Sequence, residues 1–154
     1  MGIEIERKFL VHPLLLLQVV VPAGSHYEQH YIGKKPMTRV RIADGRRAWL
    51  TIKGKGTLTR SEFEWEIPIG DARGLIQAFT LGSVVKMRYK IPHQGHTWEV
   101  DRFGGALQGL WLAEIELASA EEPFERPPWV GLEVTEDPRY TNQYLSTHAL
   151  TDLG

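Results

Sequence analysis

The chain contains no cysteine among its 154 residues. A disulfide framework, a thiolate metal site and a cysteine nucleophile are therefore excluded. An excess of charge of one sign is also missing, because the formal net charge is −1 at pH 7. This near balance argues against a broadly basic surface that binds nucleic acid. Any strong anion site must therefore come from a local concentration of Lys and Arg.

Long hydrophobic runs are missing as well. The most apolar stretch, Leu14 to Val21, has only Gln18 as a polar residue and is too short to span a bilayer. The sequence begins directly with a charged, strand-like stretch, and no signal peptide is visible. We therefore expect a cytoplasmic protein without a membrane or nucleic-acid partner, with residues 1–154 folded as a single domain.

Alternation of apolar and polar residues predicts many short strands and few helices. The expected strands are Ile3–Val11, His26–Ile32, Thr38–Ala43, Arg47–Lys53, Thr59–Pro68, Val84–Ile91, His96–Phe103 and Trp111–Ala118. Turn residues separate several of them, at Asp44-Gly45, Gly54-Lys55-Gly56 and Gly104-Gly105. Two helices are predicted: Asp71 to Leu81, with Asp71 as its N-cap, and Arg139 to Leu150 at the C-terminus.

Charged residues alternate along the first strand, where Glu4, Glu6 and Lys8 share one face and Ile5 and Phe9 share the other. Later strands repeat the pattern, but with one sign of charge per strand. The basic pairs are Arg39/Arg41 and Lys86/Arg88, and the acidic pairs are Glu62/Glu64 and Glu114/Glu116. A solvated sheet face explains any one strand. Like charges side by side are disfavoured in an open sheet, however, whereas a closed barrel would give these faces a polar lumen.

The residue types in these faces indicate the ligand. Arg forks bind phosphate oxygens bidentately and Lys adds a compact charge, so the basic pairs suit a polyanion. The Glu pairs suit a hard cation such as Mg²⁺ or Mn²⁺. Both kinds of group in one lumen fit a metal-bound polyphosphate.

The chain resembles the CYTH-domain, or triphosphate tunnel metalloenzyme, family. The defining E-x-E-x-K motif is present as Glu4-Ile5-Glu6-Arg7-Lys8. The resemblance continues in order through nearly the whole chain, at Tyr31 in a Gln-x-Tyr segment, Arg39-Val40-Arg41-Ile42, Thr51-Ile52-Lys53, Arg60-Ser61-Glu62-Phe63-Glu64, Lys86-Met87-Arg88-Tyr89, Trp98-Glu99-Val100-Asp101, Glu114-Ile115-Glu116-Leu117 and Gly131-Leu132-Glu133-Val134-Thr135. It implies an α+β, mainly β fold: an eight-stranded antiparallel closed β-barrel with a few peripheral helices and a C-terminal helix that plugs one end.

The resemblance also implies roles for individual residues. The phosphate-binding positions are matched by Lys8, Arg39, Arg41, Lys53, Arg60, Lys86 and Arg88. The metal-binding positions are matched by Glu4, Glu6, Glu114 and Glu116, with Glu62, Glu64 and Asp101 as supporting residues. Catalytic roles fall to Tyr31, Lys8 and Glu6. Tyr31 matches a tyrosine proposed as a proton acceptor, and water activated by the metal ion is the alternative source of the nucleophile.

The leading hypothesis is a triphosphatase that depends on Mg²⁺ or Mn²⁺ and hydrolyses inorganic tripolyphosphate to pyrophosphate and phosphate. The form of the first motif is closest to the bacterial inorganic triphosphatase-like members. Alternatives within the family are a class IV-type adenylate cyclase and a thiamine triphosphatase, and the non-enzyme alternative is a polyphosphate- or nucleotide-binding module. An RNA-binding barrel would require a basic outer stripe. The resemblance also suggests a homodimer.

Overall fold

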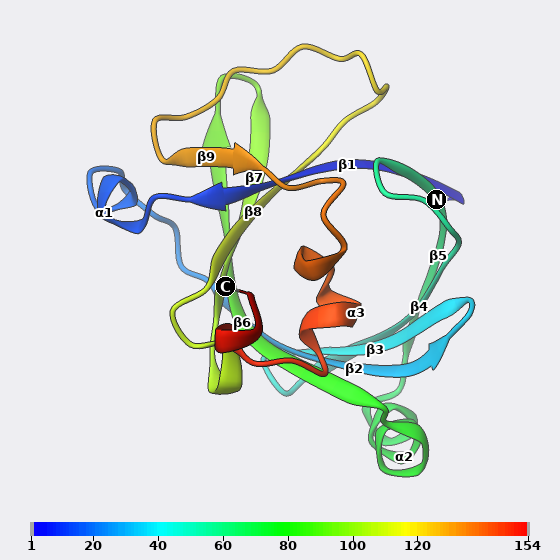
Figure 1. The fold of residues 1–154 in the computed structure, drawn as a ribbon. Helices are drawn as coiled ribbons and strands as arrows, with labels where there is room; N and C mark the ends of the chain where they lie inside the picture. The colour runs from blue at the N-terminus through cyan, green and yellow to red at the C-terminus, as the bar shows by residue number, and fades with distance from the viewer. Residues whose placement is uncertain (1, 154) are drawn as a thin grey trace.

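The computed structural model describes residues 2–153, which form a closed antiparallel β-barrel (Figure 1). The wall strands follow the order β5-β4-β3-β2-β6-β7-β8-β1, and β1 pairs back with β5 to close the sheet. Their bounds are β1 Gly2–Val11, β2 Ser25–Lys34, β3 Met37–Ala43, β4 Arg47–Lys53, β5 Thr59–Ile67, β6 Gly82–His93, β7 His96–Phe103 and β8 Trp111–Glu116. The predicted eight-stranded antiparallel barrel is confirmed.

A ninth strand, β9 (Val130–Glu133), pairs with the C-terminal end of β1 beyond the point where β5 has ended. The alternation pattern does not predict β9, because only four residues form it. The hairpin between β3 and β4 turns as predicted at Asp44-Gly45, where φ is 52° and 67°. Positive φ at both central residues is what a two-residue hairpin turn requires, and Asp-Gly is a favoured pair there.

The helix predicted at Asp71 to Leu81 lies outside the barrel wall and is shifted two residues toward the N-terminus, and a short helix that was not predicted, α1 (Pro13–Leu16), follows β1. Helix α2 spans Ile69–Phe79 and packs against β2, β3 and β4 (Figure 1). Its N-cap is Pro68 and not Asp71. Proline has no backbone N–H, and it is tolerated here because the first N–H groups of a helix have no acceptor within the helix, so no hydrogen bond is lost. Asp71 lies inside the first turn, where a carboxylate is favoured by the helix dipole.

The apolar core lies on the outer faces of the strands. Phe9, Trp98 and Ile115 alternate with the inward charges of their strands, and they are fully buried beneath the segment that contains Trp129. On the opposite wall, the outer side chains of β3 and β4 pack against α2 around Ala72. The barrel is therefore stabilised by apolar packing from outside, and its interior is left to polar groups.

One end of the lumen is closed by apolar side chains. Val84, Phe103 and Leu112 have the inward parity of their strands, but they form a cluster with Val134 and Leu145. The segment after β9 thus lies against this end of the barrel, as expected for a plug (Figure 1).

The prediction of one continuous helix from Arg139 to Leu150 is wrong. The segment consists of η2 (Pro138–Tyr140), α3 (Asn142–Leu145) and η3 (Leu150–Leu153). Thr141 separates the first two, because its backbone is extended and its Oγ1 accepts a hydrogen bond from the N–H of Tyr144 as an N-cap. Within residues 2–153 no helix is both long and apolar enough to cross a membrane.

We expect Leu145→Ala to destabilise the protein by about 2–5 kcal/mol, as for a large-to-small change in a packed core. Leu145 is 1% exposed and joins α3 to the end of the barrel. Urea denaturation measures the change, with Leu17→Ala as the matched control because Leu17 is 80% exposed. Equal free energies of unfolding for the two variants would show that the plug segment is not held by this contact.

Candidate active site

A cavity of about 350 Å³ lies inside the barrel, and all eight wall strands contribute side chains to it. The predicted site residues that line it are Glu4, Glu6, Lys8, Tyr31, Arg39, Arg41, Lys53, Arg60, Glu62, Glu64, Lys86, Arg88, Glu114 and Glu116. Residues of opposite parity on the same strands point outward. The strand alternation therefore brings every predicted site residue to one lumen except Asp101, which lies behind its lining.

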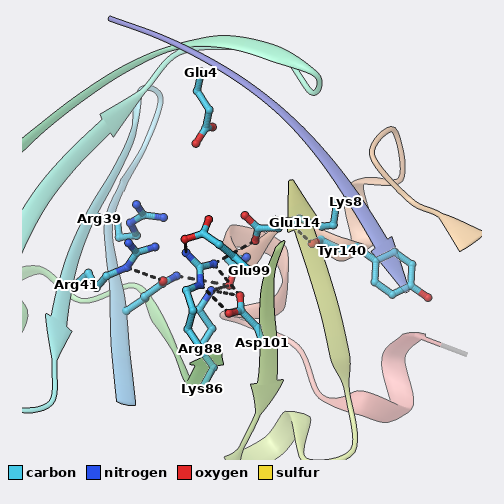
Figure 2. A network of polar contacts seen from close by, with 12 residues as sticks. Glu4, Lys8, Arg39, Arg41, Lys86, Arg88, Glu99, Asp101, Glu114 and Tyr140 are labelled. Atoms are coloured by element: carbon cyan, nitrogen blue, oxygen red, sulfur yellow. Dashed lines mark hydrogen bonds and ion pairs between the residues drawn. The ribbon is translucent and has the colours of Figure 1, made fainter. Parts of the chain in front are cut away.

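Asp101 holds two of the basic side chains in place (Figure 2). Its carboxylate accepts hydrogen bonds from Nε and Nη2 of Arg88, both at 2.8 Å, and lies 2.7 Å from Nζ of Lys86. Burial opposes ionisation of this carboxyl, but Arg88 and Lys86 hold the pKa of Asp101 below its usual value. Asp101 thus acts as a buried counter-ion that orients its two neighbours on β6, as strand pairing across β6 and β7 allows.

Lys86 and Arg88 differ in how easily they lose their charge. Burial, and then repulsion by Arg88, lowers the pKa of Lys86 to about 7 despite the attraction of Asp101. Arg88 has further ion pairs with Glu99 at 3.3 Å and Glu114 at 3.4 Å. Against the effect of burial, Asp101 and then these two carboxylates keep the pKa of Arg88 raised. The lysine is therefore the titratable cation of this pair near neutral pH.

The strands opposite carry a second cationic group. Lys53 on β4 lies 2.9 Å from a carboxylate oxygen of Glu4 and 3.4 Å from Glu62. Arg60 on β5 approaches the same Glu4 oxygen at 3.5 Å. Arg39 on β3 lies 3.6 Å from Glu64. These contacts leave each cation with a carboxylate neighbour on a different strand.

Three carboxylates lie close enough together to hold one metal ion. One oxygen each from Glu4, Glu6 and Glu116 lies within 4.8 Å of the others. Burial and the neighbouring carboxylates raise the pKa values of Glu6 and Glu116, the sign of a site short of positive charge. The donor set is oxygen only, so these residues fit a hard divalent cation. Glu114, the fourth predicted ligand, instead lies beside Arg88 and Glu6.

Two contacts tie the C-terminal segment to lysines of the lumen. Nζ of Lys8 donates a hydrogen bond of 2.9 Å to the backbone carbonyl of Tyr140 (Figure 2). Nζ of Lys86 donates a hydrogen bond of 3.0 Å to Oδ1 of Asn142 on α3. The plug thus contributes polar atoms as well as the apolar seal, and it meets the basic residues directly.

Several lining residues were missed by the sequence prediction. They are Tyr27, Met37, Trp49, Lys90, Glu99, Thr141, Asn142 and Gln143. Strand parity signals four of them, because an even spacing puts two residues on the same face of a strand: Tyr27 shares a face with Tyr31, Trp49 with Lys53, Lys90 with Arg88, and Glu99 with Asp101. No sequence period places 141–143, because these residues belong to short helical pieces that tertiary packing brings to the lumen.

The fold and this cavity define a class of protein: a closed β-barrel whose interior is lined by cations and carboxylates from all eight wall strands. The family model for the CYTH domain matches residues 2–146. The chain belongs to the CYTH domain family. Membership implies a divalent metal cofactor, in agreement with the oxygen ligands that Glu4, Glu6 and Glu116 place together.

Relatives of known name match over nearly their full length. An inorganic triphosphatase of Acetivibrio thermocellus is 42% identical over 149 residues, with 94% of each chain covered. The inorganic triphosphatase of Nitrosomonas europaea is 36% identical, over 93% of this chain and 96% of the relative. A crystal structure of an inorganic triphosphatase superposes with a TM-score of 0.65 at 32% identity, covering 94% and 95% of the two chains.

We expect Glu116→Gln to stabilise the metal-free protein more at pH 8 than at pH 5. The pKa of the Glu116 carboxyl is raised in the folded protein. Its contribution to the stability of the fold is therefore fully present at low pH and is lost as the pH rises from 4.5 through the raised pKa. The glutamine removes the titrating group together with its repulsion of Glu4 and Glu99. Thermal melting in EDTA at both pH values measures the effect. A melting difference between variant and wild type that does not change with pH would contradict it.

Proposed function

We propose that the protein is a divalent-metal-dependent triphosphatase, a hydrolase of phosphoanhydride bonds, and that its substrate is inorganic tripolyphosphate. The observation that carries the proposal is the division of one lumen into buried cations and a cluster of three carboxylates. A chain of phosphates fits the first group and a divalent cation fits the second. The names of the relatives at 42% and 36% identity support the same reaction.

The basic side chains bind and orient the phosphates. Arg39, Arg41, Lys86 and Arg88 line one part of the wall, and Lys8, Lys53 and Arg60 lie on the strands that complete it. Five of these cations are held by ion pairs, Lys8 by the carbonyl of Tyr140 and Arg41 by the amide of Gln29. Because they are already held, they can stabilise the charge that develops on the equatorial oxygens without large rearrangement. Asp101 takes no part in binding but keeps Lys86 and Arg88 aimed into the lumen.

Glu4, Glu6 and Glu116 would hold Mg²⁺ or Mn²⁺, with Glu114 beside them. Such an ion, when bound, neutralises phosphate oxygens and lowers the pKa of a water molecule. Glu62 and Glu64 support the site through Lys53 and Arg39. Through such an ion, the carboxylates would add a positive charge to the lumen in which the basic side chains bind the phosphates.

Hydrolysis transfers the terminal phosphoryl group to water. The water oxygen forms the new bond to phosphorus in line, the bond to the bridging oxygen breaks, and pyrophosphate leaves. We assign acceptance of the water proton to the phenolate form of Tyr31, a residue that lines the cavity and whose phenolic oxygen accepts a hydrogen bond of 3.0 Å from Gln29. Lys8, held at the plug by Tyr140, neutralises charge on the phosphate at that end.

The test is a substrate-by-metal panel on the purified protein. We expect phosphate release from tripolyphosphate with Mg²⁺ or Mn²⁺, none in EDTA, and slower turnover of ATP and thiamine triphosphate. Glu6→Gln should lower turnover at least about a hundredfold while the barrel stays folded, since it keeps size but removes a charge that a hard cation requires. Its matched control is Glu136→Gln, which changes an exposed carboxylate that accepts a hydrogen bond from the hydroxyl of Thr57.

Each other outcome of the panel overturns the proposal in a defined way. Tight tripolyphosphate binding without metal-dependent release would identify a binding module. Faster turnover of thiamine triphosphate, or cyclic AMP formed from ATP, would assign the site to that substrate.

Tripolyphosphate binding at pH 8 should be coupled to protonation of Lys86. The pKa of Lys86 is about 7 without ligand, and a bound polyanion raises it, so the lysine takes up part of a proton on binding. Calorimetry in buffers of different ionisation enthalpy measures the protons exchanged. The ligand titrates too, so the informative quantity is wild type minus Lys86→Met. Equal proton numbers for both proteins would contradict this linkage.

A further inference from the structure

The inward face of β2 carries no charge, although both neighbouring strands are basic. Tyr27, Gln29 and Tyr31 alternate along this strand, between the arginines of β3 and the Lys86/Arg88 pair of β6. Gln29 lies directly opposite Arg41 in the register of β2 and β3. A neutral strand at this place separates two cationic strands, and its side chains are the immediate neighbours of both.

Gln29 is fully buried, and both ends of its amide have partners. Its Oε1 accepts a hydrogen bond of 2.9 Å from Nε of Arg41, and its Nε2 donates to the hydroxyl of Tyr31 at 3.0 Å and to Oδ1 of Asn142 at 3.5 Å. The orientation of the amide is determined by this network. Nε–H of Arg41 can only donate, so it fixes Oε1 of Gln29 as the acceptor. Gln29 must therefore turn its nitrogen toward Asn142 and its oxygen toward Arg41.

Arg41 is held only at Nε. Its Cζ lies over the Tyr27 ring, 4.6 Å from the ring centre, at a distance that allows a cation–π contact. Within residues 2–153 its two terminal nitrogens have neither a hydrogen-bond acceptor nor a carboxylate partner. Arg88 contacts the same ring at 5.4 Å, but its nitrogens are engaged by Asp101, Glu99 and Glu114.

The free fork of Arg41 lies in a strongly positive environment. Burial, then Arg39 and Arg88, lower the pKa of Arg41 to about 10. A guanidinium that is held at Nε, stacked on a ring and open at both terminal nitrogens has the geometry that binds two oxygens of one phosphate. No other arginine that lines the cavity combines these three features among the described residues.

We propose that Gln29 is a positioning residue of the tripolyphosphate site, which acts by holding Arg41 through Nε so that both terminal nitrogens point to a phosphate group. The inference rests on the proposed function and adds the residue that orients its phosphate fork. The ring of Tyr27 supports Arg41 through the cation–π contact. Gln29 itself touches no substrate, and its effect on binding passes through Arg41.

A double-mutant cycle on tripolyphosphate binding tests the proposal. Affinity is measured by calorimetry in EDTA, where no hydrolysis takes place, and KM and kcat are measured separately with metal. We expect Gln29→Met, which keeps the length of the side chain but has no amide, to weaken binding about tenfold, as for one hydrogen bond to a charged group. KM should rise by a similar factor and kcat should change less. In an Arg41→Ala background the same substitution should weaken binding less than twofold.

A spectroscopic signal reports the contact directly. The Nε–H resonance of Arg41, identified by its loss in Arg41→Ala, should be protected from solvent exchange in the wild type and lose that protection in Gln29→Met. Gln77→Met is the matched control, because Gln77 is exposed on α2 outside the wall. If Gln29→Met does not fold, Gln29→Asn tests the same contact, since its shorter amide cannot reach Nε.

Three results separate this inference from the proposed function. Equal losses from Gln29→Met with and without Arg41 would overturn the positioning role, because Gln29 would then act through the fold or through another residue. A wild-type protein that neither binds nor hydrolyses tripolyphosphate would overturn the function itself. Binding by the wild type that depends on Arg41 but not on Gln29 would remove the inference alone.

Discussion

The structure depends on one constraint: a charge inside the barrel needs an opposite charge within a few ångströms, because burial makes an isolated ion very costly. Asp101 meets this need for Lys86 and Arg88, and Glu4 meets it for Lys53 and Arg60. Each of these contacts joins different strands. The inward charges of these strands must therefore be opposite in sign and aligned in register, and only a closed barrel brings all of them together.

Filling the interior with charge moves the apolar core to the outside of the wall. Trp98 and Phe9 are buried under the segment before β9, and α2 covers the outer face of β3 and β4. Apolar side chains enter the lumen only where the C-terminal segment closes it, around Leu145. The result is a rigid shell whose stability comes from outer packing, so that the inner residues are free to be chosen for binding. Because the apolar side chains close only one end, the rest of the tunnel is lined by charged side chains.

The proposed chemistry uses two opposite deficits of charge. Burial and neighbouring carboxylates raise the pKa values of Glu6 and Glu116, whereas burial and neighbouring cations lower those of Lys86 and Arg41. A metal ion and a polyphosphate would relieve both at once. Their binding is therefore expected to be mutually favourable, since each reduces the electrostatic cost of the other. Gln29, at the boundary between the cationic strands, adds direction to this otherwise non-directional attraction.

The sequence by itself determined which side chains face the lumen, because strand parity is local: Glu4, Arg41, Lys86 and their alternating partners needed only a period of two. The motifs also identified the family and the eight wall strands. Only the tertiary structure decided what has no period, such as the break at Thr141 and the approach of Asn142 to Lys86. It also decided which cation keeps free nitrogens. Arg39, Arg41 and Arg88 look alike in sequence. In the structure, carboxylates from distant strands pair with Arg88 and lie near Arg39, but none pairs with Arg41 among the described residues. Such pairing depends on register across a closed sheet, which local sequence does not contain.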